Sequence, residues 1–288
     1  MVWLEQIANG LTLGSLYGLV ALGLALLLGV ARFANFAHGE LVMLSGYVLV
    51  VLMEGYGLPY GAAAVAAVLG MAAVGGLFAV TVGLVLLERS WRMQLVGTLA
   101  VAVLLEAAVI VGFGAIPHAV PTRLASKTVR VGSLVLSHQR LLVFATVAAA
   151  FLGLQLFLAR SRTGKAMRAM AQNRETAVDL GLDVRRIAVV TFVIAGGLAG
   201  LGGALLGPLY TVTPTMGAPV TFKALAAVVM GGSEGTGGAF LAALLLGVAE
   251  ALAAGYGLAA YQDTIGFAVM VVVLLLRPQG LFGRAVRA

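Results

Sequence analysis

Long apolar runs recur along the whole chain, and short polar stretches separate them. The runs lie at roughly 7–30, 39–53, 60–87, 93–113, 138–158, 187–209, 220–231, 237–256 and 262–276. A membrane-spanning helix needs about 20 apolar residues, and several of the runs are long enough. The runs 39–53 and 220–231 are shorter and predict broken or partial helices. The pattern therefore predicts an all-α polytopic membrane bundle of about eight to nine segments, forming one domain over 1–288.

Composition supports a membrane protein and excludes several kinds of chemistry. Hydrophobic residues make up 61% of the chain and charged residues only 10%, whereas soluble domains carry about a quarter charged residues. The absence of cysteine excludes disulfides and thiolate chemistry. The pI of about 10.1 does not indicate a nucleic-acid partner, because the basic residues lie mostly beside apolar runs, where they set orientation. The opening residues lack a basic leader, so we expect a retained first helix rather than a signal peptide.

The longest basic interruption, 160–186, holds seven of the 18 Lys and Arg residues and three of the 11 acids. Loops rich in Lys and Arg face the cytoplasm, so we predict a cytoplasmic loop here. Five predicted segments precede it, which places the N-terminus outside. An even number of crossings after it would bring the basic tail inside as well. The stretch 114–140 then becomes an outer loop, and its alternating pattern predicts short strands in a small ordered cap.

Within 160–186 the sequence predicts a short amphipathic helix. Thr163 is suited to cap its start and Gly181 to end it. Its apolar face comprises Met167, Met170, Ala171, Ala177 and Val178. Methionine adapts to irregular grooves, so this face favours docking on another protein. A helix lying on the anionic inner leaflet and a solvated loop remain alternatives.

Glycine recurs at four-residue spacing, at Gly10, Gly14 and Gly18 and again at 196–200 and 203–207. Small residues let membrane helices approach closely. This pattern favours packing between helices of one chain, with a dimer interface as the alternative.

Several polar side chains interrupt the apolar runs. Ionisable groups are costly in lipid, so they normally face the interior of the bundle or an aqueous path. The candidates for a translocation path are Asn35, His38, Glu40, Glu106, Lys223 and Glu250, with Asp263 as a further polar position.

Each candidate also has a plainer interpretation. Asn35, His38 and Glu40 could form an interfacial turn, with Gly39 permitting a helix break. The carboxyls Glu106 and Glu250 could simply hold helices together, whereas their functional alternative is a proton relay. Lys223 could reach the outer interface or pair with a carboxylate. The glycine-rich stretch 231–238 fits a re-entrant connection or a tight turn.

Several motifs occur in order along nearly the whole chain. The cytoplasmic one comprises Gly164, Arg168, Ala169, Asn173, Ala177, Gly181, Arg185 and Arg186. The others are Asn35-Phe-Ala-His38-Gly-Glu40, the run 194–207, the glycine-rich run 230–247 and the ending from Asp263 to Gly283. In these motifs the chain resembles the LivH-type permeases of branched-chain amino-acid ABC importers. The resemblance implies that 160–186 couples the permease to an ATPase, with Gly164, Arg168, Asn173, Ala177, Gly181 and Arg185 as the coupling residues.

The same resemblance implies an assembly in a bacterial cytoplasmic (inner) membrane, in contact with membrane lipid. Its partners would be a second permease subunit, two cytoplasmic ABC ATPase subunits and an outer substrate-binding protein. The sequence agrees on one point, because Gly164-Lys165-Ala166 lacks the upstream glycine and the hydroxyl of a P-loop. We therefore expect no cofactor on this chain, with ATP and magnesium bound by the partner ATPases.

Other functions stay open at this stage. Permeases of the same type resemble importers of urea and short amides. A proton-coupled secondary transporter could use Glu106 or Glu250 as its carrier. An intramembrane enzyme is disfavoured, because the three histidines His38, His118 and His138 form no metal-binding pair.

Overall fold

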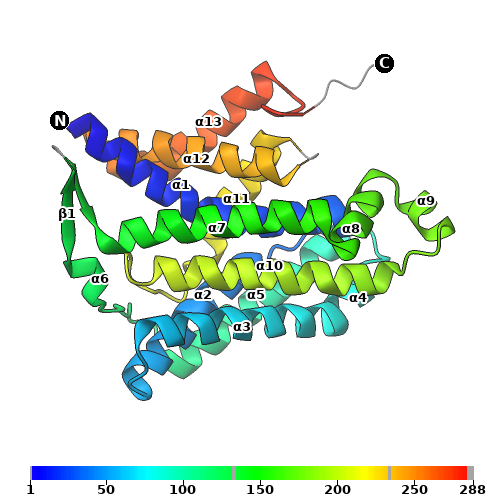
Figure 1. Ribbon diagram of the computed structural model, residues 1–288, viewed down its shortest axis with the longest axis horizontal. Coiled ribbons are helices and arrows are strands. Elements are labelled where there is room, and N and C mark those ends of the chain that lie inside the picture. Colours follow the sequence, from blue (N-terminus) through cyan, green and yellow to red (C-terminus); the bar gives the residue numbers. More distant parts are fainter. Residues whose placement is uncertain (1, 132–133, 233–234, 284–288) are drawn as a thin grey trace.

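The computed structural model describes residues 2–131, 134–232 and 235–283 as an elongated helical bundle (Figure 1). Its α-helices are α1 (Val2–Leu26), α2 (His38–Val50), α3 (Tyr60–Phe78), α4 (Leu84–Leu86), α5 (Trp91–Phe113), α6 (Arg123–Ser126), α7 (His138–Arg160), α8 (Arg162–Gln172), α9 (Arg174–Asp179), α10 (Val184–Leu206), α11 (Gly217–Gly231), α12 (Thr236–Ala253) and α13 (Gln262–Leu276). Short π-helical stretches continue some of them, namely η1 (Leu27–Ala31), η2 (Val51–Gly55), η3 (Ala79–Gly83) and η4 (Ala254–Leu258). A 3-10 turn, η5 (Ala259–Tyr261), precedes α13.

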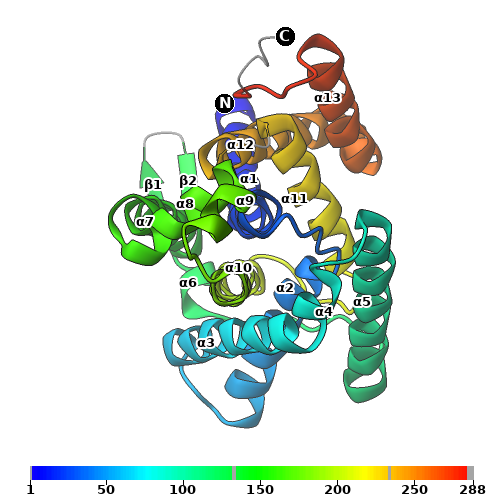
Figure 2. The same ribbon diagram turned by 90° about the vertical axis from the view of Figure 1, so that its right-hand side faces the viewer.

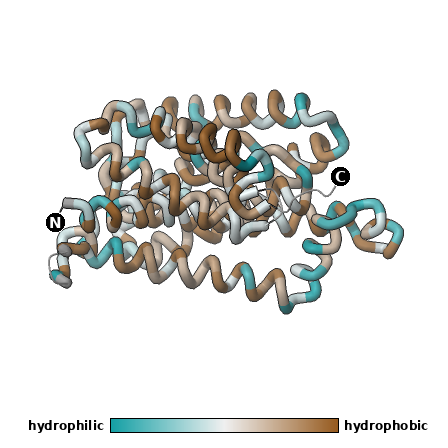
Figure 3. Tube along the Cα trace, turned by 90° about the horizontal axis from the view of Figure 1, so that it is seen from above, coloured by the Kyte–Doolittle hydropathy of each residue, from teal (hydrophilic) through white to brown (hydrophobic). Residues whose placement is uncertain are grey.

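Each of the nine predicted apolar runs coincides with a helix, which confirms the predicted all-α membrane bundle. Seven helical stretches in the described residues are long and apolar enough to cross a membrane. The last of them, Thr236–Leu276, contains both α12 and α13, and Gly257 with a φ of 83° marks the kink between them. The short run 220–231 corresponds to α11, which has 15 residues. Figure 3 shows apolar residues along the helices and hydrophilic residues mainly near the two ends.

The two ends of the bundle carry different elements. Helices α8 and α9 lie at one end, and α6 and β1 lie at the other (Figure 1). Strand β1 (Thr128–Val131) pairs antiparallel with β2 (Leu134–Ser137), which confirms the strands predicted within 114–140. His118 and Val212 exchange two backbone hydrogen bonds, so this loop is tied to the link between α10 and α11. That the loop lies outside the cell stays a prediction.

Glycines bring α1 and α10 against their neighbours within the chain. Helix α1 runs through the middle of the bundle, among α7, α10, α11 and α12 (Figure 2). A Cβ on Gly10 or Gly14 would collide with the backbone of α12, and one on Gly196 would collide with the backbone of α3. The favoured interpretation of the glycine spacing, packing within one chain, is confirmed for these positions.

Candidate functional site

The polar segment 160–186 forms two helices rather than one. Ser161 caps α8, because its Oγ accepts a hydrogen bond from the Gly164 amide at 2.8 Å. The predicted cap at Thr163 is therefore wrong, since Thr163 already lies inside the helix. Asn173 ends α8 and caps α9, accepting from the amide three residues later at 3.1 Å. Short polar side chains compete with the backbone in this way, which explains the break.

Gly181 ends α9, as predicted. It has a φ of 81°, and its amide donates to the Val178 carbonyl while the Leu182 amide donates to the Ala177 carbonyl. These two bonds form the Schellman motif, in which a left-handed glycine satisfies the last carbonyls of a helix.

The methionine face of α8 packs on its own bundle. Met167 and Met170 are fully buried in a core cluster with Leu26 of α1 and Leu158 of α7. The hypothesis that this face docks on another protein is therefore wrong for the methionines and for Ala177, which is buried in the same cluster. The 3.6-residue period identifies an apolar face but not what covers it. Ala171, Val178 and Leu180 remain exposed.

The predicted coupling residues divide between the interior and the surface. Gly164 is buried because α8 crosses α7 so closely that a Cβ would overlap the Phe157 carbonyl oxygen. The exposed Arg168 donates to the Ala159 carbonyl at 3.3 Å. Arg185 lies 4.0 Å from Glu88, with both side chains exposed, and such surface pairs contribute at most about 1 kcal/mol. Asn173 and Gly181 are also exposed.

After η1 the chain turns back into the bundle before α2 begins. The Ala34 amide donates to Gln94 Oε1 and the Phe36 amide to Thr98 Oγ1, each at 3.1 Å. Gln94 and Thr98 lie one turn apart on α5, so residues 34–36 run along that helix. Because side chains satisfy these amides, a non-helical segment can exist inside the bundle.

Asn35 and His38 lie in the interior of the protein. The Asn35 side chain accepts from the Ala37 amide at 3.1 Å and closes the turn. The fully buried imidazole of His38 occupies space beside Gly23 of α1, where a Cβ would come within 2.6 Å of Nε2. Gly23 leaves room for the imidazole inside the bundle, so the His38 side chain does not extend outward. Asn35 closes the turn before α2, and the place of this turn relative to the headgroups stays a prediction.

The N-termini of α2 and α11 meet beside Glu40. The Gly39 amide donates to Thr221 Oγ1 at 2.8 Å, and the Glu40 carboxyl packs on Gly217. The sequence predicted a helix break at Gly39. Instead, Gly39 lies within α2, and its lack of a side chain lets α11 approach. Within the described part of the chain, Glu40 Oε2 and both nitrogens of His38 have no hydrogen-bond partner. Helix N-termini carry partial positive charge, so the acidic Glu40 is placed favourably.

Glu106 lies on α5. It follows the buried Ala102 by four residues and therefore lies on the same side of the helix. It is partly exposed, and no ion pair involving it occurs among the described residues.

Lys223 is the centre of a charge cluster in which Asp263 is exposed and the other members are buried. Its Nζ lies 2.9 Å from Glu250 Oε2 and 2.7 Å from Asp263 Oδ1, and it donates to the Tyr17 hydroxyl at 2.8 Å. The same hydroxyl donates to Glu250 Oε2 at 3.1 Å. Four helices are joined by these contacts: α1, α11, α12 and α13. Of the alternatives for Lys223, pairing with a carboxylate is confirmed, and Glu250 holds helices together.

Known proteins with similar sequences identify the family. A family model described as "Branched-chain amino acid transport system / permease component" matches residues 6–274. The chain belongs to this permease family. It is 33% identical to the high-affinity branched-chain amino acid transport system permease protein BraD of Pseudomonas aeruginosa, over 98% of this chain and 96% of that protein. It is 32% identical to LivH of Escherichia coli K12, over 99% and 96% of the two chains. A ribose import permease, RbsC of Bacillus subtilis, is 29% identical over 46% of this chain and 44% of its own length.

The resemblance drawn from the sequence motifs is thus confirmed. This permease is a transport component rather than an enzyme, and it is a multi-pass membrane protein. Among the described residues no three His, Asp or Glu side chains gather as metal ligands would.

Sequence reasoning missed four residues of the permease's polar interior. Tyr17 supplies a hydroxyl to the Lys223 cluster, Thr221 joins α11 to α2, and Gln94 and Thr98 hold the segment before α2. They could have been found if every polar residue within or beside an apolar run had been counted as a candidate, and not mainly the ionisable ones. The glycine-rich stretch remains undecided, because residues 233–234 lie outside the described part of the chain.

Proposed function

We propose that this chain is a permease subunit of an ATP-driven importer of branched-chain or related small amino acids. It would form the translocation path together with a second permease subunit in a bacterial cytoplasmic membrane. Two ABC ATPase subunits would bind at the α8–α9 end, and a substrate-binding protein at the end that carries the β-hairpin. The relatives' names supply the substrate class.

One observation carries the mechanism: a continuous line of packed residues joins the α8–α9 end to the α2–α11 junction. Met167 and Met170 share a core cluster with Leu26 of α1. One turn before Leu26 on α1, Gly23 packs against His38, the first residue of α2. Residues of α2 then contact Gly217 and Thr221 of α11. Because these contacts are tight, a displacement of α8 would shift the junction.

The junction has the chemistry that an amino-acid zwitterion requires. Glu40 offers a carboxylate for the ammonium group, and helix N-termini attract a carboxylate group. Broken helices whose ends meet inside the bundle are a common device in transporters. Asn35 and His38 would shape this part of the path, with Glu106 beside it on α5. Lys223 pairs with Glu250 and with Asp263, which favours a structural role and speaks against Glu250 as a free proton carrier.

The test of this function is reconstitution of the complete assembly in liposomes. We expect ATP hydrolysis to rise when ligand-loaded binding protein is added, together with uptake of the amino acid. Uptake that persists without ATP and stops with a protonophore would refute the proposal in favour of a proton-coupled carrier.

Leu180→Asp is expected to weaken binding of the ATPase subunits. Leu180 is 77% exposed at the end of α9, outside the spanning helices. Buried apolar anchors at interfaces contribute about 2 kcal/mol or more, so we expect affinity to fall at least about tenfold. The measurement is the dissociation constant between the purified permease and its ATPase. Glu175→Gln, on the exposed side of the same helix, is the matched control. Unchanged affinity in Leu180→Asp would show that the ATPase binds elsewhere.

A further inference from the structure

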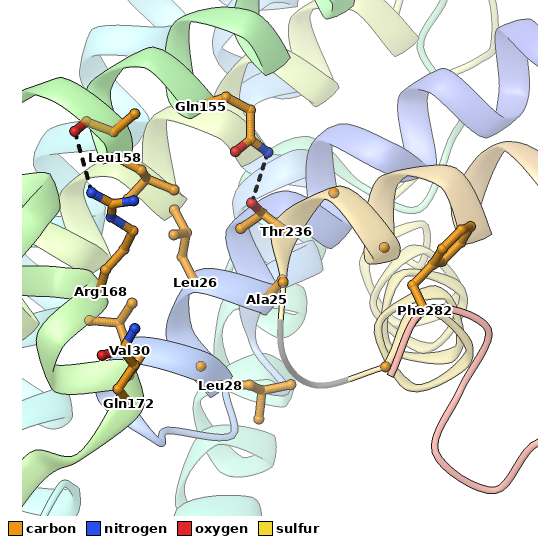
Figure 4. Close-up of a pocket in the computed structure, with 18 of the residues that line it drawn as sticks. Ala25, Leu26, Leu28, Val30, Gln155, Leu158, Arg168, Gln172, Thr236 and Phe282 are labelled. Carbon is orange, nitrogen blue, oxygen red and sulfur yellow. Dashed lines mark hydrogen bonds between the residues drawn. The ribbon is translucent and has the colours of Figure 1, made fainter. Parts of the chain in front are cut away.

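A cavity of about 1240 Å³ opens at the α8–α9 end of the bundle. It lies between the ends of α1 and α7, the helix α8, the start of α12 and the tail after α13. Figure 4 shows Arg168 and Gln172 on one side and Thr236 and Phe282 on the other. Its volume exceeds that of most small-molecule pockets, which measure about 300–1,000 Å³.

The lining of the cavity combines cationic and apolar side chains. Arg32 and Arg168 contribute two positive charges, and among the described lining residues none is acidic. The half-buried Ala25 and Leu28 give the cavity an apolar side at the last turns of α1 and at η1, next to the buried Leu26 and Val30. The first turn of α12 adds backbone amides at Gly237 and Gly238, since its cap, Gly235, has no side chain to satisfy them.

The position of the cavity matches the edge of a membrane. The spanning stretches Trp3–Ala31 and His138–Arg160 both end beside it, and its wall includes the last turns of each. A ligand there would meet apolar side chains toward the bundle and arginines toward water.

Arg32 has an unusual backbone conformation at the mouth of this cavity. Its φ is 52°, and it is the single non-glycine residue with a positive φ in the described ranges. A left-handed conformation is costly for a residue with a Cβ and is normally taken by glycine or asparagine. Here the conformation ends η1, because the Arg32 amide donates to the Leu27 carbonyl, and the chain leaves the helix beside the cavity.

We infer that this cavity binds the headgroup of an anionic phospholipid. The phosphodiester lies between Arg32 and Arg168, and the upper part of an acyl chain lies against the half-buried Ala25 and Leu28. Guanidinium groups bind phosphate oxygens through paired hydrogen bonds, and basic pockets between membrane helices are suited to lipid headgroups. The apolar side of the cavity favours a lipid over free phosphate, which has no apolar part. Arg168 then acts from the side of α8 that lines the cavity, whereas Leu180 lies at the exposed end of α9, where we propose that the ATPase binds.

Native mass spectrometry of the full chain in detergent tests this inference. The probes are phosphatidylglycerol and phosphatidylcholine with identical dioleoyl chains, each titrated separately. We expect about tenfold stronger retention of phosphatidylglycerol, since each basic residue near an anionic headgroup contributes severalfold in affinity. Equal retention of the two lipids would overturn the inference.

Three variants locate the site. Arg32→Gln with Arg168→Gln should abolish the preference, whereas Arg162→Gln with Lys165→Gln, which removes the same two charges from exposed positions of α8 outside the cavity, should keep it. Gly29→Leu leaves both arginines in place but projects into open space in the cavity, since nothing lies within 4 Å of a Cβ there. It should also abolish the preference. A preference that survives both cavity variants would place the lipid elsewhere.

A second measurement separates lipid from soluble anions. Phosphatidylglycerol should raise the unfolding temperature of the wild-type chain but not that of Gly29→Leu. An equal rise with inorganic phosphate alone would contradict a lipid site and indicate a site for soluble anions.

Discussion

Replacing Lys223 with methionine is expected to lower the free energy of unfolding by about 3–5 kcal/mol, because it leaves Glu250 buried without a cation. Glu250 is fully buried and is held by Lys223 and by Tyr17. Those contacts join α1, α11 and α12, so the loss would loosen the centre of the bundle. The measurement is the unfolding equilibrium of the purified chain in mixed micelles, titrated with a denaturing detergent.

The double variant Lys223→Met with Glu250→Gln is the decisive control. It removes the unpaired charge, and replacing both partners of a buried pair is often nearly neutral, so we expect it to recover most of the stability. Asp263→Asn should have a small effect, because the Asp263 side chain is 69% exposed. A single variant as stable as the wild type, or a double variant less stable than the single one, would contradict a structural role for this cluster.

The sequence predicted the helices well because membrane helices are specified locally. An apolar run of sufficient length must be helical in lipid, whatever its neighbours are. The kink at Gly257 and the link 32–37 were also visible as interruptions between runs. The helix ends were less certain, as Ser161 shows. Both Ser161 and Thr163 are good caps, and the backbone geometry that selects between them depends on the contact of α8 with α7.

The partners of polar residues could not be predicted in the same way. Lys223 and Glu250 are 27 residues apart, and Tyr17 is 206 residues from Lys223. Nothing in the local sequence of any of them specifies the others. The same holds for His38, whose burial depends on a glycine in the preceding helix. Periodicity gave α8 an apolar face, but the covering of that face by α1 and α7 is a property of the whole bundle.

Gly39→Ala is expected to disrupt the junction of α2 and α11, although it adds a single methyl group. A Cβ at this position would overlap the Gly217 carbonyl oxygen and the Thr221 hydroxyl, so α11 must move away from α2. The first obstacle is backbone, which cannot relax by a change of rotamer. Overpacking of this kind costs about 1–3 kcal/mol. The movement would also break the hydrogen bond from the Gly39 amide to Thr221.

Gly70→Ala is the matched control, since nothing lies within 4 Å of a Cβ there and the position is in the middle of α3. Alanine has the higher helix propensity, so this control should be neutral or up to about 1 kcal/mol more stable. Two measurements are needed on both variants, the unfolding equilibrium and substrate uptake by the reconstituted complex. If the junction lies on the path, Gly39→Ala should reduce uptake even where the protein remains folded and its ATPase subunits remain bound. Uptake and stability equal to those of Gly70→Ala would mean that α2 and α11 tolerate separation, and the junction would lose its proposed role.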